Sequence, residues 1–421
     1  MTVVVRLPSP PRAVEAVAAA VLAVGGRAYA VGGCVRDAAM GHALKDWDIE
    51  VHGIDVDTLE QALRRVGRVS AVGRSFAVLK VKAHGLELDV SLPRRDSKAG
   101  PGHRGIAVVA DPHLGLREAT RRRDLTVNAM MVDLHDGTLH DPWGGLNDLD
   151  ARVLRAVDAG TFLEDPLRAL RAIQFLARLG FAPHDSLLRL CAEAALDELA
   201  PERVWGEWVK ALGRGRHLSS ALRAAVHANV HQRTLGVPPP ASLDAWADLV
   251  EAAASQRDSL EPEGRQLAWM CLAWLTPYDV AEAAAIMDRL GVHTWLGYKL
   301  RDSVLAALAE RETPLNSDAA LRWLSTRAEV GLVTAWRALL GDAQAAEARA
   351  RAEALGVLWA PPHPLVLGRD AIALGALPGR AMGEALDAVR SAQLDGEVRD
   401  AEGARALLAA ILRPSAPARA D

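Results

Sequence analysis

The stretch that decides the fold is YAVGGCVRD at residues 29–37, followed closely by DWDIEV at residues 46–51. Its apolar start predicts a short strand that turns through Gly32 and Gly33 into a helix. Glycines at such a turn let backbone N–H groups approach an anion, and the helix N-terminus adds a partial positive charge. Arg36 would then lie in the first turn and meet a phosphate. The alternative is a Gly-Gly turn selected only for its backbone angles.

Acidic residues alternate with apolar ones in two predicted strands. Asp46 and Asp48 flank Trp47, so both carboxylates lie on one face of the first strand. Two converging carboxylates repel unless a cation lies between them, and hard oxygen ligands suit Mg²⁺. In LELDV at residues 86–90, Asp89 could supply a third ligand from an adjacent strand, as two-metal phosphoryl-transfer sites require. The alternative for each strand is a solvated end or edge.

The periodicity of apolar residues divides the chain near residue 150. Before that point, β-like runs alternate with helical stretches, which predicts an α+β head with a mixed or antiparallel sheet. After it, Ala and Leu recur at three- and four-residue spacing and nine of the eleven Trp lie beyond Pro201, which predicts an all-α remainder. Pro238–Pro240 and Pro361-Pro362 are expected at joints between helices, because proline removes a donor and fixes φ. The predicted strands are 28–31, 48–51, 78–82 and 86–92, and the predicted helix of the head is 56–66.

The composition excludes a chain that binds nucleic acid through bulk positive charge. The 421 residues carry 49 Lys plus Arg against 53 Asp plus Glu, a net charge of -4. The first 220 residues are nearly neutral and hold 29 of the 49 basic residues, whereas the remainder carries a net charge of -5. Any nucleic-acid surface is therefore expected to be local and to lie along the first 220 residues.

The cysteines and the N-terminal sequence indicate the cellular compartment of the protein. Cys34, Cys191 and Cys271 are far apart and predict neither a disulfide framework nor a zinc site. The first residues do not read as a signal peptide or a membrane span. We therefore expect a cytoplasmic protein with no membrane partner.

Two later segments carry polar groups in patterns that suit a nucleotide. RRRDLTVNA at residues 121–129 places three guanidiniums beside Asp124 and Asn128, and these groups fit triphosphate oxygens and ribose hydroxyls. EDPLRALR at residues 164–171 predicts a helix start, with Asp165 as N-cap and Pro166 in the first helical position. The spacing predicts a polar stripe at positions 168, 171, 174 and 178, with Leu167, Leu170 and Ile173 turned inward.

Each of these segments also has a plainer interpretation. The arginine-rich segment could be a charged helix face. Asp165 and Arg168 could present a fixed acceptor and donor to a base edge, or they could form a surface ion pair.

Taken in order, four motifs resemble those of the class II tRNA nucleotidyltransferases, a family that contains CCA-adding enzymes and bacterial poly(A) polymerases. They are GGCVRD at 32–37, DWD at 46–48, RRDLTVNA at 122–129 and EDPLR at 164–168. PERVW at 201–205 resembles the family's neck motif, and residues 367–396 are similar to the tail of members that lack a phosphohydrolase domain. The resemblance implies a nucleotidyltransferase head at residues 1–150, a base-recognising neck at 151–220, a tRNA-binding helical body at 221–360 and a tRNA-binding helical tail at 361–412. Residues 413–421 are expected to be a disordered C-terminus.

The resemblance also implies roles for individual residues. Asp46 and Asp48 would bind the catalytic Mg²⁺, with Asp89 as a third catalytic carboxylate at a position that is often Glu in relatives. The other motif residues would bind the nucleotide: Gly32, Gly33 and Arg36 at the phosphates, Arg123, Asp124 and Asn128 at the triphosphate and ribose, and Asp165, Arg168 and Arg171 at the base of CTP or ATP. One acceptor and one donor can pair with the amine and adjacent ring nitrogen of C or A, whereas G and U present the opposite order.

The implied activity is addition of the 3′-terminal CCA, as C and/or A residues, to the tRNA 3′ end. The substrates would be CTP and ATP, used without a nucleic-acid template, in a Mg²⁺-dependent transfer that releases pyrophosphate. The loop at Arg95–Asp111 has full length, which favours a complete CCA enzyme or an A-adding specialist over one restricted to CC, and Gly73–Val78 resembles the tRNA-directed branch. The alternatives left open are an A-adding or CC-adding specialist, a bacterial poly(A) polymerase and a non-catalytic RNA-binding module. Monomer and homodimer also stay open.

Overall fold

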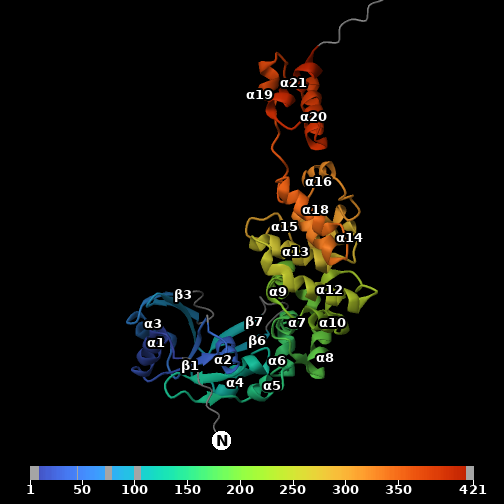
Figure 1. Cartoon of the computed structure of the whole chain (residues 1–421). Helices are drawn as coiled ribbons and strands as arrows, with labels where there is room; N and C mark the ends of the chain where they lie inside the picture. Colours follow the sequence, from blue (N-terminus) through green and yellow to red (C-terminus); the bar gives the residue numbers. More distant parts are fainter. Residues whose placement is uncertain (1–8, 45, 72–77, 99–105, 414–421) are drawn as a thin grey trace, which may run out of the picture. The chain divides into compact units, whose positions relative to one another are not determined.

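The computed structural model describes residues 9–44, 46–71, 78–98 and 106–413 (Figure 1). The chain divides into two units, of which the first is Met1–Glu251 with Arg289–Gly291 and the second is Ala252–Asp288 with Val292–Asp421. Three expectations lie outside the described residues. They concern Gly73–Ala77, residues 99–105 of the Arg95–Asp111 loop, and residues 414–421 of the C-terminus.

The head contains a seven-stranded mixed sheet in the order β3-β4-β5-β2-β1-β8-β9. Neighbouring strands are antiparallel except β2 and β5, which run parallel and place Asp48 beside Asp89. The strands predicted from alternation are confirmed in position. The bounds are β1 Arg27–Val31, β2 Asp48–His52, β3 Arg68–Ala71, β4 Val78–Ala83, β5 Leu86–Ser91, β8 Met131–Asp133 and β9 Leu139–His140.

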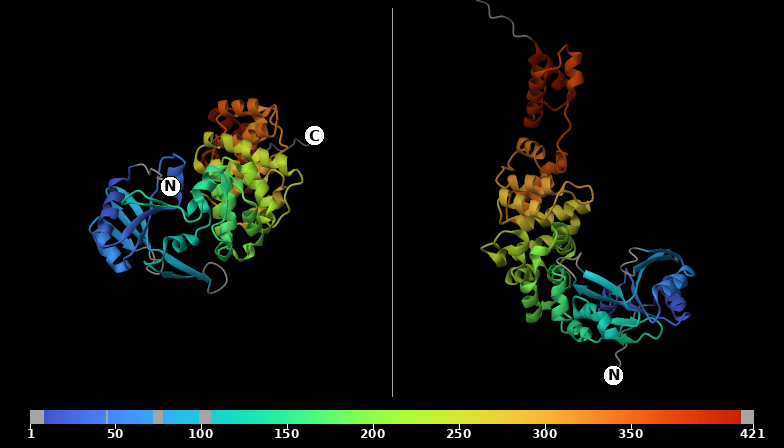
Figure 2. Two further views of the ribbon diagram at one scale, coloured as in Figure 1. Left: turned by 90° about the horizontal axis from the view of Figure 1, so that it is seen from below. Right: turned by 180° about the vertical axis from the view of Figure 1, so that it is seen from behind.

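Two helices, α1 (Arg12–Leu22) and α3 (Val56–Arg64), pack side by side on one face of this sheet (Figure 2). The start of α3 is fixed by Asp55, whose side chain accepts a hydrogen bond from the Thr58 N–H at 2.8 Å. The helix then buries Leu59 and Leu63, one turn apart, against the head core. The apolar face of β2, with Ile49 and Val51 fully buried, belongs to the same core.

Shorter elements complete the head and lead into the helical neck. The hairpin is β6 (Arg94–Lys98) with β7 (Ile106–Ala110), and a second pair is β10 (Val153–Leu154) with β11 (Ala182–Pro183). The helices of the head are α2 (Gly33–Ala39), α4 (Leu116–Arg121), η3 (Thr126–Asn128) and α5 (Gly145–Asp150). Those that follow are α6 (Ala159–Glu164), α7 (Leu167–Leu179), α8 (Asp185–Glu193), η4 (Leu196–Glu198), α9 (Pro201–Arg214), α10 (Leu218–His227), α11 (Val230–Leu235) and α12 (Leu243–Gln256). Helix α7 packs against α9 and α10, so its apolar side is buried in the neck.

The named elements of the second unit are all helices. Its core is built on α13, whose Trp269 and Trp274 are buried together with Trp336 of α17. Prolines 361 and 362 lie between α18 and α19, and prolines 238–240 lie between α11 and α12, as predicted. The bounds are η5 Arg257–Ser259, α13 Glu263–Leu275, α14 Val280–Arg289, α15 Leu300–Ala309, α16 Asp318–Ser325, α17 Val330–Leu339, α18 Ala345–Ala354, α19 Gly368–Ala373, α20 Arg380–Asp395 and α21 Ala401–Leu412. Among the described residues, no helix is long and apolar enough to cross a bilayer.

Helix α7 ends at Gly180, which has a left-handed φ of 65°. A Cβ at this position would lie 2.6 Å from the His217 ring, so both the backbone and the packing require glycine. The arrangement matters for the cavity described below because α7 forms one of its walls.

We expect Gly180→Ala to lower the thermal midpoint of the full chain. The left-handed conformation alone costs an alanine about 1–2 kcal/mol, and overpacking against His217 adds about 1–3 kcal/mol. Gly137→Ala is the matched control, because Gly137 has a φ of 76° and no atom within 4 Å of the added Cβ. Equal midpoints for the two variants would contradict the packing argument.

Candidate active site

A cavity of about 1230 Å³ opens in the first unit, bounded by α2, the start of β2, the segment 122–128, α7 and α9. Eleven of the twelve predicted site residues line it: Gly32, Gly33, Arg36, Asp46, Asp48, Arg123, Asp124, Asn128, Asp165, Arg168 and Arg171. Among the described residues, nine arginines and five aspartates form its wall. This excess of guanidiniums suits a polyphosphate.

The predicted carboxylates meet at the edge of this cavity. Asp46 and Asp48 line it, while Trp47 between them is buried on the other side, as alternation predicted. Asp89 is not among the lining residues, but the parallel β2–β5 pairing places it directly beside Asp48. The Asp89 side chain is about half exposed, at 49%, and its Oδ1 lies 3.4 Å from Lys80 Nζ.

The electrostatics of Asp48 fit a cation site. Loss of surrounding solvent raises the pKa of Asp48, the charge of Arg123 opposes that rise, and the carboxylates of Asp89 and Asp46 add to it. A divalent cation would remove this repulsion, and carboxylate oxygens are the ligands that hard divalent cations prefer. Within the described residues, no group of three or more His, Cys, Asp or Glu could hold a metal ion. The fit therefore rests on the Asp46 and Asp48 pair, with room in the cavity for substrate oxygens.

The Gly-Gly turn lets an arginine reach this carboxylate pair. Gly32 has a φ of 76°, and a Cβ on it would lie 2.7 Å from Arg123 Nη1 and 3.9 Å from Asp48 Oδ2. The side chain of Arg123 therefore packs directly on the bare backbone of the turn. The glycine is needed here for close approach as well as for its backbone angles.

A chain of hydrogen bonds joins α2, η3 and α7 across the cavity. Arg36 Nη1 donates to Asn128 Oδ1 at 2.6 Å, and Asn128 Nδ2 donates to Asp124 Oδ1 at 3.1 Å. Asp124 Oδ2 accepts from Arg171, whose Nη2 lies 2.7 Å away. Burial alone would raise the pKa of Asp124, but the charge of Arg171 and the hydrogen bond from Asn128 outweigh it and lower the pKa.

The pair predicted to read the base at the start of α7, Asp165 and Arg168, makes contacts with residues of both the neck and the head. Asp165 Oδ1 accepts a hydrogen bond from the Leu167 N–H at 3.2 Å and lies 3.4 Å from Arg203 Nη2 of α9. Arg168 donates to the backbone carbonyls of Thr161 and Arg122, the latter at 2.7 Å. These contacts fix the direction of both side chains at the cavity wall.

The polar stripe predicted along α7 is wrong at two positions. Gln174 is buried rather than part of the stripe, and Leu167 lines the cavity rather than turning inward. At about 100° per residue, Phe175 lies only about 40° from Arg171 around the helix, so the cavity face is centred on these residues and Gln174 falls at its edge. Helix α7 packs against α9 and α10, and Gln174 is buried at 2% exposure.

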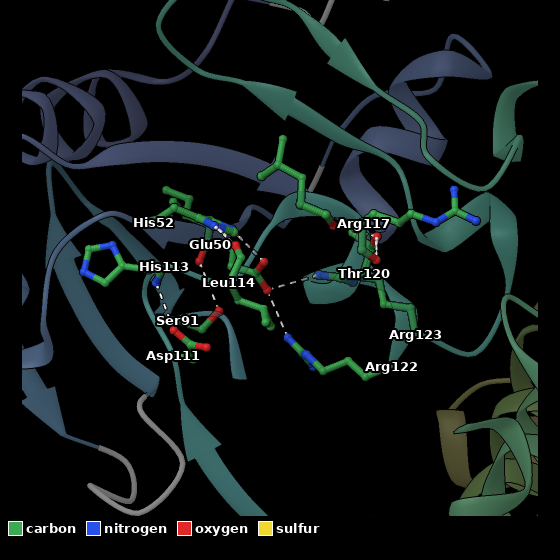
Figure 3. A network of polar contacts seen from close by, with 12 residues as sticks. Glu50, His52, Ser91, Asp111, His113, Leu114, Arg117, Thr120, Arg122 and Arg123 are labelled. Atoms are coloured by element: carbon green, nitrogen blue, oxygen red, sulfur yellow. Dashed lines mark hydrogen bonds and ion pairs between the residues drawn. The ribbon is translucent and has the colours of Figure 1, made fainter. Parts of the chain in front are cut away.

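Sequence reasoning missed Glu50, the next acidic residue on the same face of β2. Glu50 is fully buried and holds Arg122 Nη2 at 2.9 Å, Arg123 Nη2 at 4.0 Å and His52 Nε2 at 3.1 Å (Figure 3). The other ring nitrogen of His52 lies 3.2 Å from the carbonyl oxygen of Leu114. Burial would raise the pKa of Glu50, but the hydrogen bond from His52 and the charges of Arg123 and Arg122 lower it. The signal that could have found it is the continued alternation at 46, 48 and 50.

Comparison with known proteins shows what the head is similar to. Residues 28–155 match the family described as "Poly A polymerase head domain". The head of this chain is therefore similar to that family.

Curated relatives match nearly half of the chain. A "Multifunctional CCA protein" from Xanthomonas campestris pv. campestris (strain B100) is 42% identical over 211 residues, covering 47% of this chain and 50% of that protein. A protein of the same name from Stenotrophomonas maltophilia (strain K279a) is 44% identical over 191 residues, covering 44% and 45%. The chain thus spans about half the length of the curated relatives it matches.

Solved structures of CCA-adding enzymes match over nearly the whole chain. The Bacillus stearothermophilus CCA-adding enzyme in complex with CTP has a TM-score of 0.73 at 24% identity and covers 95% of this chain and 97% of its own. The Thermotoga maritima CCA-adding enzyme complexed with tRNA has a TM-score of 0.61 at 23% identity, covering 95% of each. These likenesses confirm the predicted fold, an α+β head followed by helices.

We expect Glu50→Ala to destabilise the full chain by about 3–5 kcal/mol, because it leaves buried cationic groups without their carboxylate. Glu50→Gln should cost less, since it keeps hydrogen-bonding atoms at the same place. The matched control is Glu87→Ala, which removes an exposed partner of Lys80 and Lys82 and should change stability little. Urea denaturation would measure all three variants, and a Glu50→Ala effect no larger than that of Glu87→Ala would contradict the assignment.

Proposed function

We propose that this protein adds the 3′-terminal CCA, as C and/or A residues, to tRNA from CTP and ATP without a nucleic-acid template. The observation that carries the proposal is the single cavity in which the Asp46 and Asp48 pair, the Gly32-Gly33 turn and the Asp165 and Arg168 pair come together. The head family and the likeness to CCA-adding enzymes support the same activity. Cytoplasmic location is part of the proposal, supported by three free, buried cysteines.

In this proposal, Asp165 and Arg168 choose the base. One acceptor and one donor, fixed by Leu167, Arg203 and the backbone carbonyls, match the amine and ring nitrogen of cytosine or adenine. Guanine and uracil would place like groups against both side chains and leave them unpaired, which is costly in a desolvated site. Protein side chains would thus replace a nucleic-acid template.

The transfer itself is a displacement at the α-phosphorus. The tRNA 3′-hydroxyl oxygen forms the new bond, the bond from the α-phosphorus to the bridging oxygen breaks, and pyrophosphate leaves. Asp46 and Asp48 would hold Mg²⁺, with Asp89 as the third carboxylate; when bound, the cation supplies positive charge that orients the reacting oxygens and offsets their charge. Arg36, Arg123 and the turn backbone would orient the triphosphate, while Asp124 and Asn128 would meet the ribose.

Three tRNA transcripts test this function, ending before CCA, after C and after CC. Each is incubated with CTP alone, ATP alone and both nucleotides. Extension of all three to the full CCA supports a complete CCA enzyme, and extension only of the CC transcript by ATP identifies an A-adding specialist. Processive extension of an unstructured oligo(A) primer instead would make the protein a poly(A) polymerase, and binding of tRNA without any extension would make it a non-catalytic RNA-binding module.

We expect Asp46→Ala and Asp48→Ala each to abolish nucleotide incorporation, because a single remaining carboxylate would not hold the divalent cation that the transfer needs. Single-turnover incorporation of labelled CTP would measure the effect. Asp57→Ala is the control, since Asp57 is exposed at the start of α3 outside the cavity. Normal turnover in either cavity variant would overturn the carboxylate assignment.

Asp165→Ala is expected to loosen nucleotide choice more than it slows chemistry. The base loses its acceptor while the carboxylates and phosphate-binding groups keep theirs, so discrimination against UTP and GTP should fall by about tenfold or more. The ratio of kcat/KM for CTP and ATP to that for UTP and GTP measures it. An unchanged ratio would remove Asp165 from base recognition.

A further inference from the structure

Two arginines of the cavity wall, Arg178 and Arg214, have no role in the motifs. Arg178 lies in the last turn of α7 and Arg214 is the last residue of α9, and both line the cavity. Other arginines of the wall have carboxylate partners, such as Glu50 for Arg122 and Asp124 for Arg171. Over the described ranges of the chain, neither Arg178 nor Arg214 has a hydrogen bond or ion pair.

Arg178 is part of a crowded set of guanidiniums around one ring. The Phe175 ring centroid lies 5.3 Å from the Arg36 guanidinium carbon, 5.5 Å from that of Arg171 and 5.8 Å from that of Arg178. Stacking on a phenyl ring orients a guanidinium but does not neutralise it.

The charges at this end of the cavity are unbalanced. Burial lowers the pKa of Arg178, and the charges of Arg36 and Arg214 lower it further, with Asp37 acting in the opposite direction. Asp37 itself is bound to Arg36 Nη2 at 2.7 Å, so its charge is already shared. Like charges held together in a partly desolvated wall are costly without an anion between them.

We propose that Arg178 and Arg214 form a subsite for the β- and γ-phosphates of the incoming nucleotide and for the pyrophosphate that leaves. This inference rests on the proposed function for the identity of the nucleotide. Arg178 stacks on the same ring as Arg36, which the proposed function places at the phosphates, and it follows Arg171 by seven residues, or about two helix turns. The base-reading Arg168 is ten residues away along α7, or about 15 Å. Planar guanidinium forks match the oxygens of a polyphosphate.

The subsite acts when the transfer occurs. As the tRNA 3′-oxygen bonds to the α-phosphorus and loses its proton to water, the bond to the bridging oxygen breaks and its electron pair passes to pyrophosphate. The two guanidiniums face the charge that develops on this leaving group. They therefore bind every nucleoside triphosphate alike, whatever its base, and bind free pyrophosphate as well.

The test compares Arg178→Gln, Arg214→Gln and the double variant with wild type. Isothermal titration of the full chain with inorganic pyrophosphate, with and without Mg²⁺, measures the subsite without RNA or nucleotide. We expect the double variant to bind pyrophosphate about tenfold or more weakly, because each lost charge-assisted hydrogen bond weakens binding by that order. In the transfer assay, the KM for CTP and for ATP should rise by the same factor, with selection against GTP and UTP and the KM for tRNA unchanged.

Arg216→Gln is the matched control, because Arg216 is exposed two residues beyond Arg214 and does not line the cavity. Arg178→Lys keeps the charge and should recover part of the affinity, which a loss of folding would not allow. A raised KM for tRNA with unchanged pyrophosphate binding would assign the arginines to the RNA backbone and overturn the proposal. Unchanged pyrophosphate binding and unchanged KM values in all variants would also overturn it. If wild type extends no tRNA, the proposed function fails, while the pyrophosphate titration still decides the subsite.

Discussion

The partly buried ion pair between Asp124 and Arg171 is the contact on which the cavity depends. Asp124 follows the arginine-rich segment of the head, and Arg171 comes from the first helix turns of the neck. Through Asn128, the same carboxylate is tied to Arg36 on α2. Because one desolvated carboxylate serves all three elements, the Gly32-Gly33 turn, the segment 122–128 and helix α7 keep one relative position. Such preorganisation is what the proposed recognition of a nucleotide without a template would require.

The arginines of the segment 121–123 have a second set of carboxylate partners on β2. Buried Glu50 pairs with Arg122 and lies near Arg123, and the charge of Asp48, which lines the cavity, also acts on Arg123. Arg123 is thus held between two carboxylates of one strand and rests on the bare backbone of Gly32. The head therefore neutralises part of its own arginine cluster from within.

The sequence allowed the local structure and most of the cavity wall to be predicted, but not the partners within it. Alternation in residues 46–51 was enough to place Asp48 outward and Trp47 inward, because strand geometry has a fixed period. The pairing of Glu50 with Arg122, 72 residues later, depends on how α4 packs, and no local pattern encodes that. Gln174 and Leu167 were misplaced for a related reason: helical periodicity gives directions around the axis, whereas burial is decided by which neighbours cover each direction.

Strand β2 is buried on both faces, and the two faces differ completely. Asp48, Glu50 and His52 point to the polar side, and Ile49 and Val51 point to the apolar core. A shift of one residue in its pairing would exchange the faces, placing charged groups in the core and aliphatic ones against the arginines. Each misplaced charge costs several kcal/mol, so a misregistered head would not persist as a folded species. The polarity of its two faces therefore sets the pairing register of β2, so an error in this pairing is removed during folding and is not carried into the folded head.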